Sequence, residues 1–288
     1  MSGRPSAARR SAIQRIGYVG LALAALVTVA PIGLILGIMI WRGAPAISLE
    51  FLTAMPRDGL RAGGVLPAIV GTFWLTLGTA IVAVPLGIGA AIYLAEYAAD
   101  SRWTRAIRVA IINLAGIPSV VYGLFGLGLF VLFLQFGTSI LAGSLTLAIM
   151  TLPVIISTSE EALRAVPGSF RVVSISLGGS RWQTVWRIVL PQALPGILTG
   201  VILGLERAAG ETAPILFTAA ALFLPRLPTS IFDPTMALPY HLFVIATQIP
   251  GMPVQIQYGT ALVLITFVLG MNLIATLIRS RARARRQW

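Results

Sequence analysis

The chain has 288 residues, of which 57% are hydrophobic and only 10% are charged, a balance that is typical of membrane proteins and argues against a soluble globular protein. Cysteine is absent, which excludes disulfides, thiolate metal sites and cysteine nucleophiles, and His241 is the one histidine. All 21 basic residues are arginine, so the chain lacks the lysine of a phosphate-binding P-loop and is not expected to hydrolyse ATP by itself.

Six apolar runs are each long enough to cross the roughly 30 Å of membrane hydrocarbon, which takes about 20 helical residues. They occupy residues 17–41, 66–98, 109–135, 140–158, 192–219 and 259–278. The second run contains Pro85 and has room for a break, whereas only a short turn near Gly137-Thr138 separates the third from the fourth. The sequence therefore predicts an all-α polytopic membrane protein with six transmembrane helices.

The first run resembles a signal peptide in one respect, because arginines precede it. Its apolar stretch far exceeds the roughly 7–15 residues of a signal core, so we interpret it as a retained span. The chain then divides into a basic cytoplasmic arm at 1–16, a first transmembrane helix with an external loop at 17–64, a transmembrane domain at 65–280, and a basic cytoplasmic tail at 281–288.

The arginines are distributed unequally between the two sides of the predicted membrane. Sixteen lie in the two terminal segments and in the connections 99–108 and 159–191, four lie in the connections 42–64 and 220–258, and Arg207 lies within a span. The positive-inside rule then places both termini in the cytoplasm. The net charge is +12, and we interpret the basic tail at 279–288 as an anchor against anionic lipid headgroups rather than as a nucleic-acid binding segment.

Two connections are too long to be simple turns. The cytoplasmic connection 159–191 is amphipathic, and Pro167-Gly168 ends the helix that leaves the membrane. A short helix over about 169–177, a turn at Gly178-Gly179 and a second helix over about 181–190 would form a helix–turn–helix elbow that returns to the membrane at Pro191. The external connection 220–258 contains an apolar stretch that is too short to span, which predicts a re-entrant or surface-lying helix.

The first helix of the elbow carries apolar side chains at helical spacing. Phe170, Val173 and Leu177 recur at i, i+3 and i+7, and we expect them to be exposed. Such a stripe suits the groove of a soluble partner protein. Packing against the neighbouring helices of the same chain explains the spacing equally well.

Three charged residues interrupt the fifth apolar run. On a helix, Arg207 and Glu211 would share a face and pair, whereas Glu206 would point about 140° away from Glu211. Arg207 lies 16 residues after Pro191, or about 24 Å along a helix, which places the pair in the outer half of the bilayer. Charges at this depth usually face a protein interior or a wet cavity.

Other polar residues have simpler interpretations. Glu96, near the end of the second span, and His241, in the external connection, are expected at the membrane interface. The glycine-rich run at 123–128 has no preceding strand and is interpreted as close helix packing rather than a nucleotide loop. Arg226 and Asp233 could contact an external partner, although no spacing argument supports this.

The elbow sequence LGGSRWQTVWRIVLPQALPG resembles the cytoplasmic loop signature of permeases from ABC importers. The signature glycine, isoleucine, leucine and proline correspond to Gly178, Ile188, Leu190 and Pro191. The stretches PLGIGAAIYLAEYA, NLAGIPSVVYGLFGLG, TLPVIISTSEEALRAVP and RAAGETAPILFTA are similar to the PstA-type permeases of phosphate importers, over roughly residues 65–280.

The resemblance implies the type I ABC-importer permease fold and a division of labour. A second permease subunit of the PstC type would complete the pathway, two ATPase subunits of the PstB type would bind ATP and Mg, and an extracytoplasmic phosphate-binding protein of the PstS type would deliver substrate. The chain itself would bind no cofactor. ATPase coupling would fall to the elbow residues Ser169, Phe170, Val173, Leu177, Gly178, Ile188, Leu190 and Pro191.

The same resemblance gives the intramembrane charges a candidate role in the path of phosphate, with Arg207 lining it and Glu211 orienting Arg207. A self-neutralised pair that locks two helices together remains the alternative. Arg207, Glu206 and Glu211 sum to −1, so an anion path would need a cation from a partner chain or a carboxyl held neutral by burial. An importer for another oxyanion or polar solute, and a stand-alone secondary transporter or channel, also remain open.

The chain departs from the family signature at one place. The signature begins with an acidic and two small residues, but Val172, Val173 and Ser174 occupy these positions. A polar contact of that acid with the ATPase is therefore absent, and a more apolar contact is expected in its place.

Overall fold

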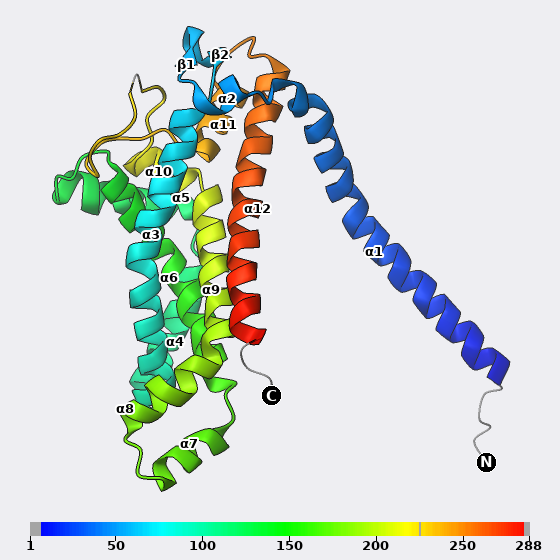
Figure 1. Ribbon diagram of the computed structural model, residues 1–288, viewed down its shortest axis with the longest axis vertical. Helices are drawn as coiled ribbons and strands as arrows, with labels where there is room; N and C mark the ends of the chain where they lie inside the picture. Colours follow the sequence, from blue (N-terminus) through cyan, green and yellow to red (C-terminus); the bar gives the residue numbers. More distant parts are fainter. Residues whose placement is uncertain (1–6, 225, 285–288) are drawn as a thin grey trace.

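The computed structural model describes residues 7–224 and 226–284, with side chains described for 14–224 and 226–281. Most of this region is helical, and the long helices other than α1 lie roughly side by side in an elongated body (Figure 1). Five helices are long and apolar enough to cross a membrane, and a sixth crossing results if a bent pair of helices counts as one span. The basic arm at 1–16 and tail at 281–288 lie partly outside the described residues.

The long helices follow the predicted runs and extend beyond most of them, because polar ends continue a helix outside the hydrocarbon. They are α1 (Ala7–Gly43), α3 (Leu66–Ile92), α6 (Ile140–Arg164), α9 (Leu190–Gly210) and α12 (Val254–Ala284). The helix α3 passes Pro85 without a break and continues into a π-helical turn, η3 (Tyr93–Tyr97).

The predicted third span at 109–135 is not one straight helix. It consists of α4 (Arg102–Ala115) followed by α5 (Ser119–Gly126) and the π-helical turn η4 (Leu127–Phe133), and the two halves meet at 101°. Pro118 disfavours a helical conformation at the residue before it, so α4 ends at Ala115 and a short break separates it from α5.

The helix observed at the fifth span also differs from the predicted one. The helix does not begin at Pro191, because α8 (Arg181–Thr184), the π-helical turn η5 (Val185–Val189) and α9 form one continuous 30-residue helix. A proline ring clashes with the carbonyl of the preceding helical turn, and the wider π-helical turn just before Pro191 relieves that clash. The helix ends at Gly210, and the short α10 (Ala213–Thr218) follows after a break.

The helices α3, α6 and α9 pack closely through small and hydroxyl side chains, as is common for helices that associate in membranes. The glycines Gly200 and Gly204 of α9 face Thr158 and Ile155 of α6, and a Cβ atom at either glycine would lie within 3 Å of these side chains. Thr79 of α3 is fully buried and donates its hydroxyl to the carbonyl of Leu75. This close packing holds the centre of the body together.

The end of the body at which α3 begins carries more secondary structure than the sequence predicts. The loop 42–64 forms η1 (Ala44–Ala46), α2 (Leu49–Thr53) and a small hairpin of β1 (Pro56–Arg57) and β2 (Ala62–Gly63) joined by η2 (Asp58–Leu60). In the external connection, α11 (Leu238–Thr247) forms the expected short apolar helix, and the amide of Leu238 donates to the Thr72 hydroxyl of α3 at 2.8 Å.

The helix α1 projects away from the body and touches it only near its C-terminal end (Figure 1). There the Arg42 guanidinium lies 5.7 Å from the ring centre of Tyr258 in α12. None of the most apolar window of α1 is buried in the chain, so lipid or another membrane chain must cover it.

His241 lies in α11 and is buried rather than interfacial, with 3% of its surface exposed and no hydrogen-bond partner for Nδ1 among the described residues. Burial disfavours the charged imidazolium and lowers the pKa of His241 from 6.5 to about 4. The folded chain therefore holds His241 neutral down to a pH at which the unfolded chain has already bound a proton.

This difference predicts a loss of stability on acidification. Between pH 7.5 and pH 5, proton uptake by the unfolded state should cost about 2 kcal/mol of unfolding free energy, because stability falls as the pH drops below the unfolded pKa. Thermal unfolding in detergent should show a smaller acid shift for His241→Gln than for the wild-type chain. Equal shifts in the two proteins would contradict this account of His241.

Candidate functional site

The charged pair of the fifth span forms at the end of α9 rather than within a helix. Glu211 is the first residue beyond the helix and has an extended backbone, with φ −76° and ψ 137°. Its carboxylate still accepts a hydrogen bond from Arg207 Nε at 3.3 Å. The predicted pairing is therefore present, but the expectation that both residues lie on one helix face is wrong for Glu211.

Two breaks in helices come together at this pair. Tyr122 of α5 is buried and donates its hydroxyl at 2.7 Å to the carbonyl of Leu114, in the last turn of α4. Gly123, the next residue of α5, packs against the start of α10, where an added Cβ atom would lie 3.0 Å from the Ala213 carbonyl oxygen. The kink between α4 and α5 therefore lies near the break between α9 and α10, so irregular backbone and the charged pair are combined at one place.

The surroundings of Glu211 are tightly packed. A cavity of only about 10 Å³ lies beside it, lined by residues of α3, α6, α9, α10 and α11 and of the segment before α11. A phosphate ion is far too large for this space. On this side Glu211 is packed against the chain, whereas the Arg207 side chain is 36% exposed and Gly210 is exposed, so the pair lies at the edge of the described chain.

Glu206 faces another direction, as its helical position predicts. It lies in a groove of about 180 Å³ between α9 and α12, and its Oε1 atom is buried without a partner among the described residues. The other lining residues are all apolar: Leu198, Val201, Ile202, Leu205, Met271, Ala275 and Ile278. An ionised carboxylate is costly in such a groove unless another chain supplies a cation.

The elbow at 159–191 has the predicted form. The helix α7 (Gly168–Ser176) is followed by a turn in which Gly178 has φ +83°, a conformation that favours glycine, and then by α8. Ser180 and Gln183 form a reciprocal capping box at the start of α8. The Ser174 and Thr184 hydroxyls lie 2.8 Å apart and join the two arms of the elbow.

The exposed face of α7 differs from the predicted one. Val173 and Leu177 are exposed as expected, and Leu177 is 84% exposed. Phe170 is instead half-buried against the hydrophobic core at the elbow end of the body. The helix α7 lies across that end, so its Phe170 side turns inward. Exposed Val172 and Ile175 extend the apolar face, which we call the elbow face and define as Val172, Val173, Ile175 and Leu177.

The remaining predicted coupling residues have two different environments. Ser169 and Gly178 are exposed beside the elbow face, whereas Ile188, Leu190 and Pro191 are half-buried on the continuous helix behind it. Leu190 packs on the same core as Phe170. Ser169 and Gly178 are therefore accessible to a partner chain. The three half-buried residues instead pack behind the elbow.

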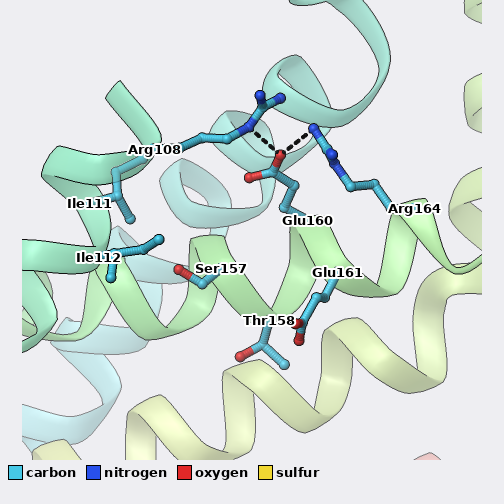
Figure 2. A pocket seen from close by; sticks show the side chains of 8 residues that line it. All are labelled: Arg108, Ile111, Ile112, Ser157, Thr158, Glu160, Glu161 and Arg164. Atoms are coloured by element: carbon cyan, nitrogen blue, oxygen red, sulfur yellow. Dashed lines mark hydrogen bonds and ion pairs between the residues drawn. The ribbon is translucent and has the colours of Figure 1, made fainter. Parts of the chain in front are cut away.

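A cavity of about 390 Å³, lined by both charged and apolar side chains, opens between α4 and α6 near the end of the body that carries the elbow (Figure 2). Glu160 accepts from Arg108 Nε at 2.8 Å and pairs with Arg164 Nη2 at 2.9 Å, so it lies between two guanidinium groups. Ser157 and Glu161 also line the cavity. The four charges of this cluster cancel, and no spacing signal in the sequence brings Arg108 and Glu160 together.

Comparison with known proteins gives a consistent result for most of the chain. Residues 83–285 match the family described as "Binding-protein-dependent transport system inner membrane component". The chain is 36% identical to the probable ABC transporter permease protein YqgI of Bacillus subtilis, over 90% of this chain and 92% of that protein. It is 35% identical to the phosphate transport system permease protein PstA of Mycobacterium leprae, over 98% of this chain and 93% of that protein.

Solved structures show the same fold at low sequence identity. A bacterial ABC transporter involved in alginate import matches with a TM-score of 0.64 and 14% identity, over 94% of this chain and 97% of the matched chain. The MetNI methionine ABC transporter, in an inward-facing conformation, matches with a TM-score of 0.59 and 16% identity, over 76% of this chain and 94% of the matched chain.

Proposed function

Because the chain belongs to the family of binding-protein-dependent transport system inner membrane components, we propose that it is the membrane-spanning permease subunit of an ATP-driven importer of inorganic phosphate. The observation that carries the proposal is the similarity along nearly the whole chain to permeases named for phosphate transport. The chain would move phosphate across the plasma membrane by alternating access, driven by a separate ATPase subunit.

The partners follow from this role. A second permease subunit of the PstC type would complete the pathway, and two ATPase subunits of the PstB type would bind ATP and Mg on the cytoplasmic side. A binding protein of the PstS type would deliver phosphate to the outer end. The excess of arginine in the terminal segments and in the connections 99–108 and 159–191 supports cytoplasmic termini and a cytoplasmic elbow.

For the substrate path we propose Arg207 as the phosphate-binding residue and Glu211 as the residue that orients it. Their pair stands at two helix breaks, where the local backbone can rearrange. Glu206 enters the proposal as the carboxyl that a partner chain must neutralise, because its own groove offers it no cation.

For ATPase coupling we propose the elbow face together with Ser169 and Gly178. Four exposed apolar side chains on the outside of a cytoplasmic elbow favour association with a hydrophobic groove. The valines at the positions of the signature acid and its neighbour belong to this face, so the contact would be apolar where other family members use a charge.

The assay that tests this function is co-purification of the whole complex followed by ATPase measurement in liposomes. We expect an ATPase to co-purify, and we expect phosphate with its binding protein to stimulate hydrolysis, whereas sulfate does not. Stimulation by sulfate alone would identify an importer of another oxyanion. Phosphate transport by this chain without any ATPase would instead identify a secondary transporter or channel.

A further inference from the structure

Three arginines from three different helices converge on the π-helical turn η3 at the cytoplasmic end of α3. Arg108 of α4 donates through Nη2 to the Leu94 carbonyl at 2.9 Å. Arg171 of α7 pairs with the Glu96 carboxylate, and the Arg181 guanidinium of α8 lies 5.5 Å from the ring centre of Tyr97. Both arms of the elbow are thus attached to the same turn.

The Arg171–Glu96 pair is the centre of this arrangement. Arg171 Nε lies 3.2 Å from each carboxylate oxygen of Glu96, and its Nη2 also donates to that carboxylate. The same guanidinium donates to the carbonyl of Leu163, in the last turn of α6, at 2.9 Å and to that of Val166, just after α6, at 2.7 Å. One side chain of the elbow therefore holds the ends of both α3 and α6.

Burial makes this pair different from the surface ion pairs of the chain. The Glu96 side chain is 8% exposed and that of Arg171 is 24% exposed. In contrast, Asp100 and Arg105 lie nearby with their closest charged atoms 3.9 Å apart and both side chains largely exposed. Removal of one partner from a buried pair leaves an uncompensated charge, whereas exposed pairs contribute little.

We propose that the Arg171–Glu96 pair is a latch that transmits movement of the elbow to α3, and that Glu96 is a positioning residue for transport. This inference rests on the proposed function, in which an ATPase moves the elbow face. When α7 moves, the latch obliges η3 and the end of α6 to follow. Because α3 and α6 pack along α9, the displacement reaches the helices around Arg207.

The test compares phosphate uptake and ATP hydrolysis in the reconstituted whole complex, with the ratio of the two rates as the readout. We expect Glu96→Gln and Arg171→Gln each to lower phosphate moved per ATP hydrolysed by at least about fivefold, the lower end of typical coupling effects. The double variant should be no worse than the worse single variant, because both remove one interaction. Arg171→Lys, which keeps the charge, should retain part of the ratio, and Asp100→Asn serves as the matched control with no change.

The outcomes separate the latch from the proposed function. If the wild-type complex shows no phosphate-dependent ATP hydrolysis, the proposed function is wrong. If the wild-type complex is coupled and both rates fall in parallel in the variants, the pair only supports the fold and the latch is wrong. Additive losses in the double variant would also overturn the latch. Should Glu96→Gln fail to assemble, Arg171→Lys still decides, because an unchanged ratio in that variant with assembled complex overturns the latch.

Discussion

Replacing Arg207 by glutamine is expected to reduce phosphate uptake by about 100-fold while the complex still assembles. Arg207 is 36% exposed in this chain and would be desolvated only against the anion and the partner subunit. Loss of such a charged contact costs a few kcal/mol, which corresponds to a change of this size. Uptake of radiolabelled phosphate into proteoliposomes measures the effect. Arg226→Gln is the matched control, because Arg226 pairs with Asp233 in the exposed external connection, 3.6 Å apart.

A second variant separates the two interpretations of this pair. Arg207→Gln leaves Glu211 without its cation, and that alone could disturb the helix break. In the double variant Arg207→Gln/Glu211→Gln no charge is left unpaired, so a purely structural pair predicts recovery of uptake. We expect the double variant to remain inactive, because the anion still lacks its guanidinium. Recovery of uptake would show that the pair only locks the fold.

The second large effect is expected at the elbow face. Leu177→Asp should weaken binding of the ATPase subunit by about 30-fold or more, because burying a new carboxylate in an apolar contact costs at least about 2 kcal/mol. The ATPase retained during purification of the complex, and its affinity for the permease in detergent, measure this loss. Leu177 is the most exposed apolar side chain of the elbow face, so the substitution should leave the fold intact.

The control for this experiment lies at the opposite end of the molecule. Leu222 is 53% exposed in the external connection, and Leu222→Asp introduces the same charge on a comparable surface. It should leave the affinity for the ATPase unchanged. If Leu177→Asp also binds the ATPase as tightly as the wild-type chain, the elbow face is not the docking surface.

The sequence predicts the spans well because the length of an apolar run is a local property. The helices α6 and α12 contain the runs predicted for them, and the elbow appears where Pro167 and Gly178 mark its turns. The direction of a helix is not local. The run at 109–135 joins the end of the amphipathic α4 to the more apolar α5, and hydropathy averaged along the run hides where the direction changes. Hydropathy therefore could not reveal the 101° bend, even though Pro118 stands at it.

The candidate sites show the same limit. The pairing of Arg207 with Glu211 could be predicted because four residues separate them, and i,i+4 neighbours meet on a helix. Arg171 and Glu96 are 75 residues apart, so only the packing of α7 across the end of α3 brings them together. Phe170 was predicted to be exposed because spacing alone cannot tell which side of a short helix faces the protein.

The continuous helix from Arg181 to Gly210 is about 45 Å long, and it runs from the elbow to the intramembrane charges without a break. Its glycines hold it against α6 about two-thirds of the way along, at Gly200 and Gly204. A rod that is supported between its ends behaves as a lever with unequal arms. Rocking by about 10° about Gly200 would move the Arg181 end by about 5 Å and the Gly210 end by about 3 Å in the opposite direction, so a larger movement at the elbow becomes a smaller one at the intramembrane charges.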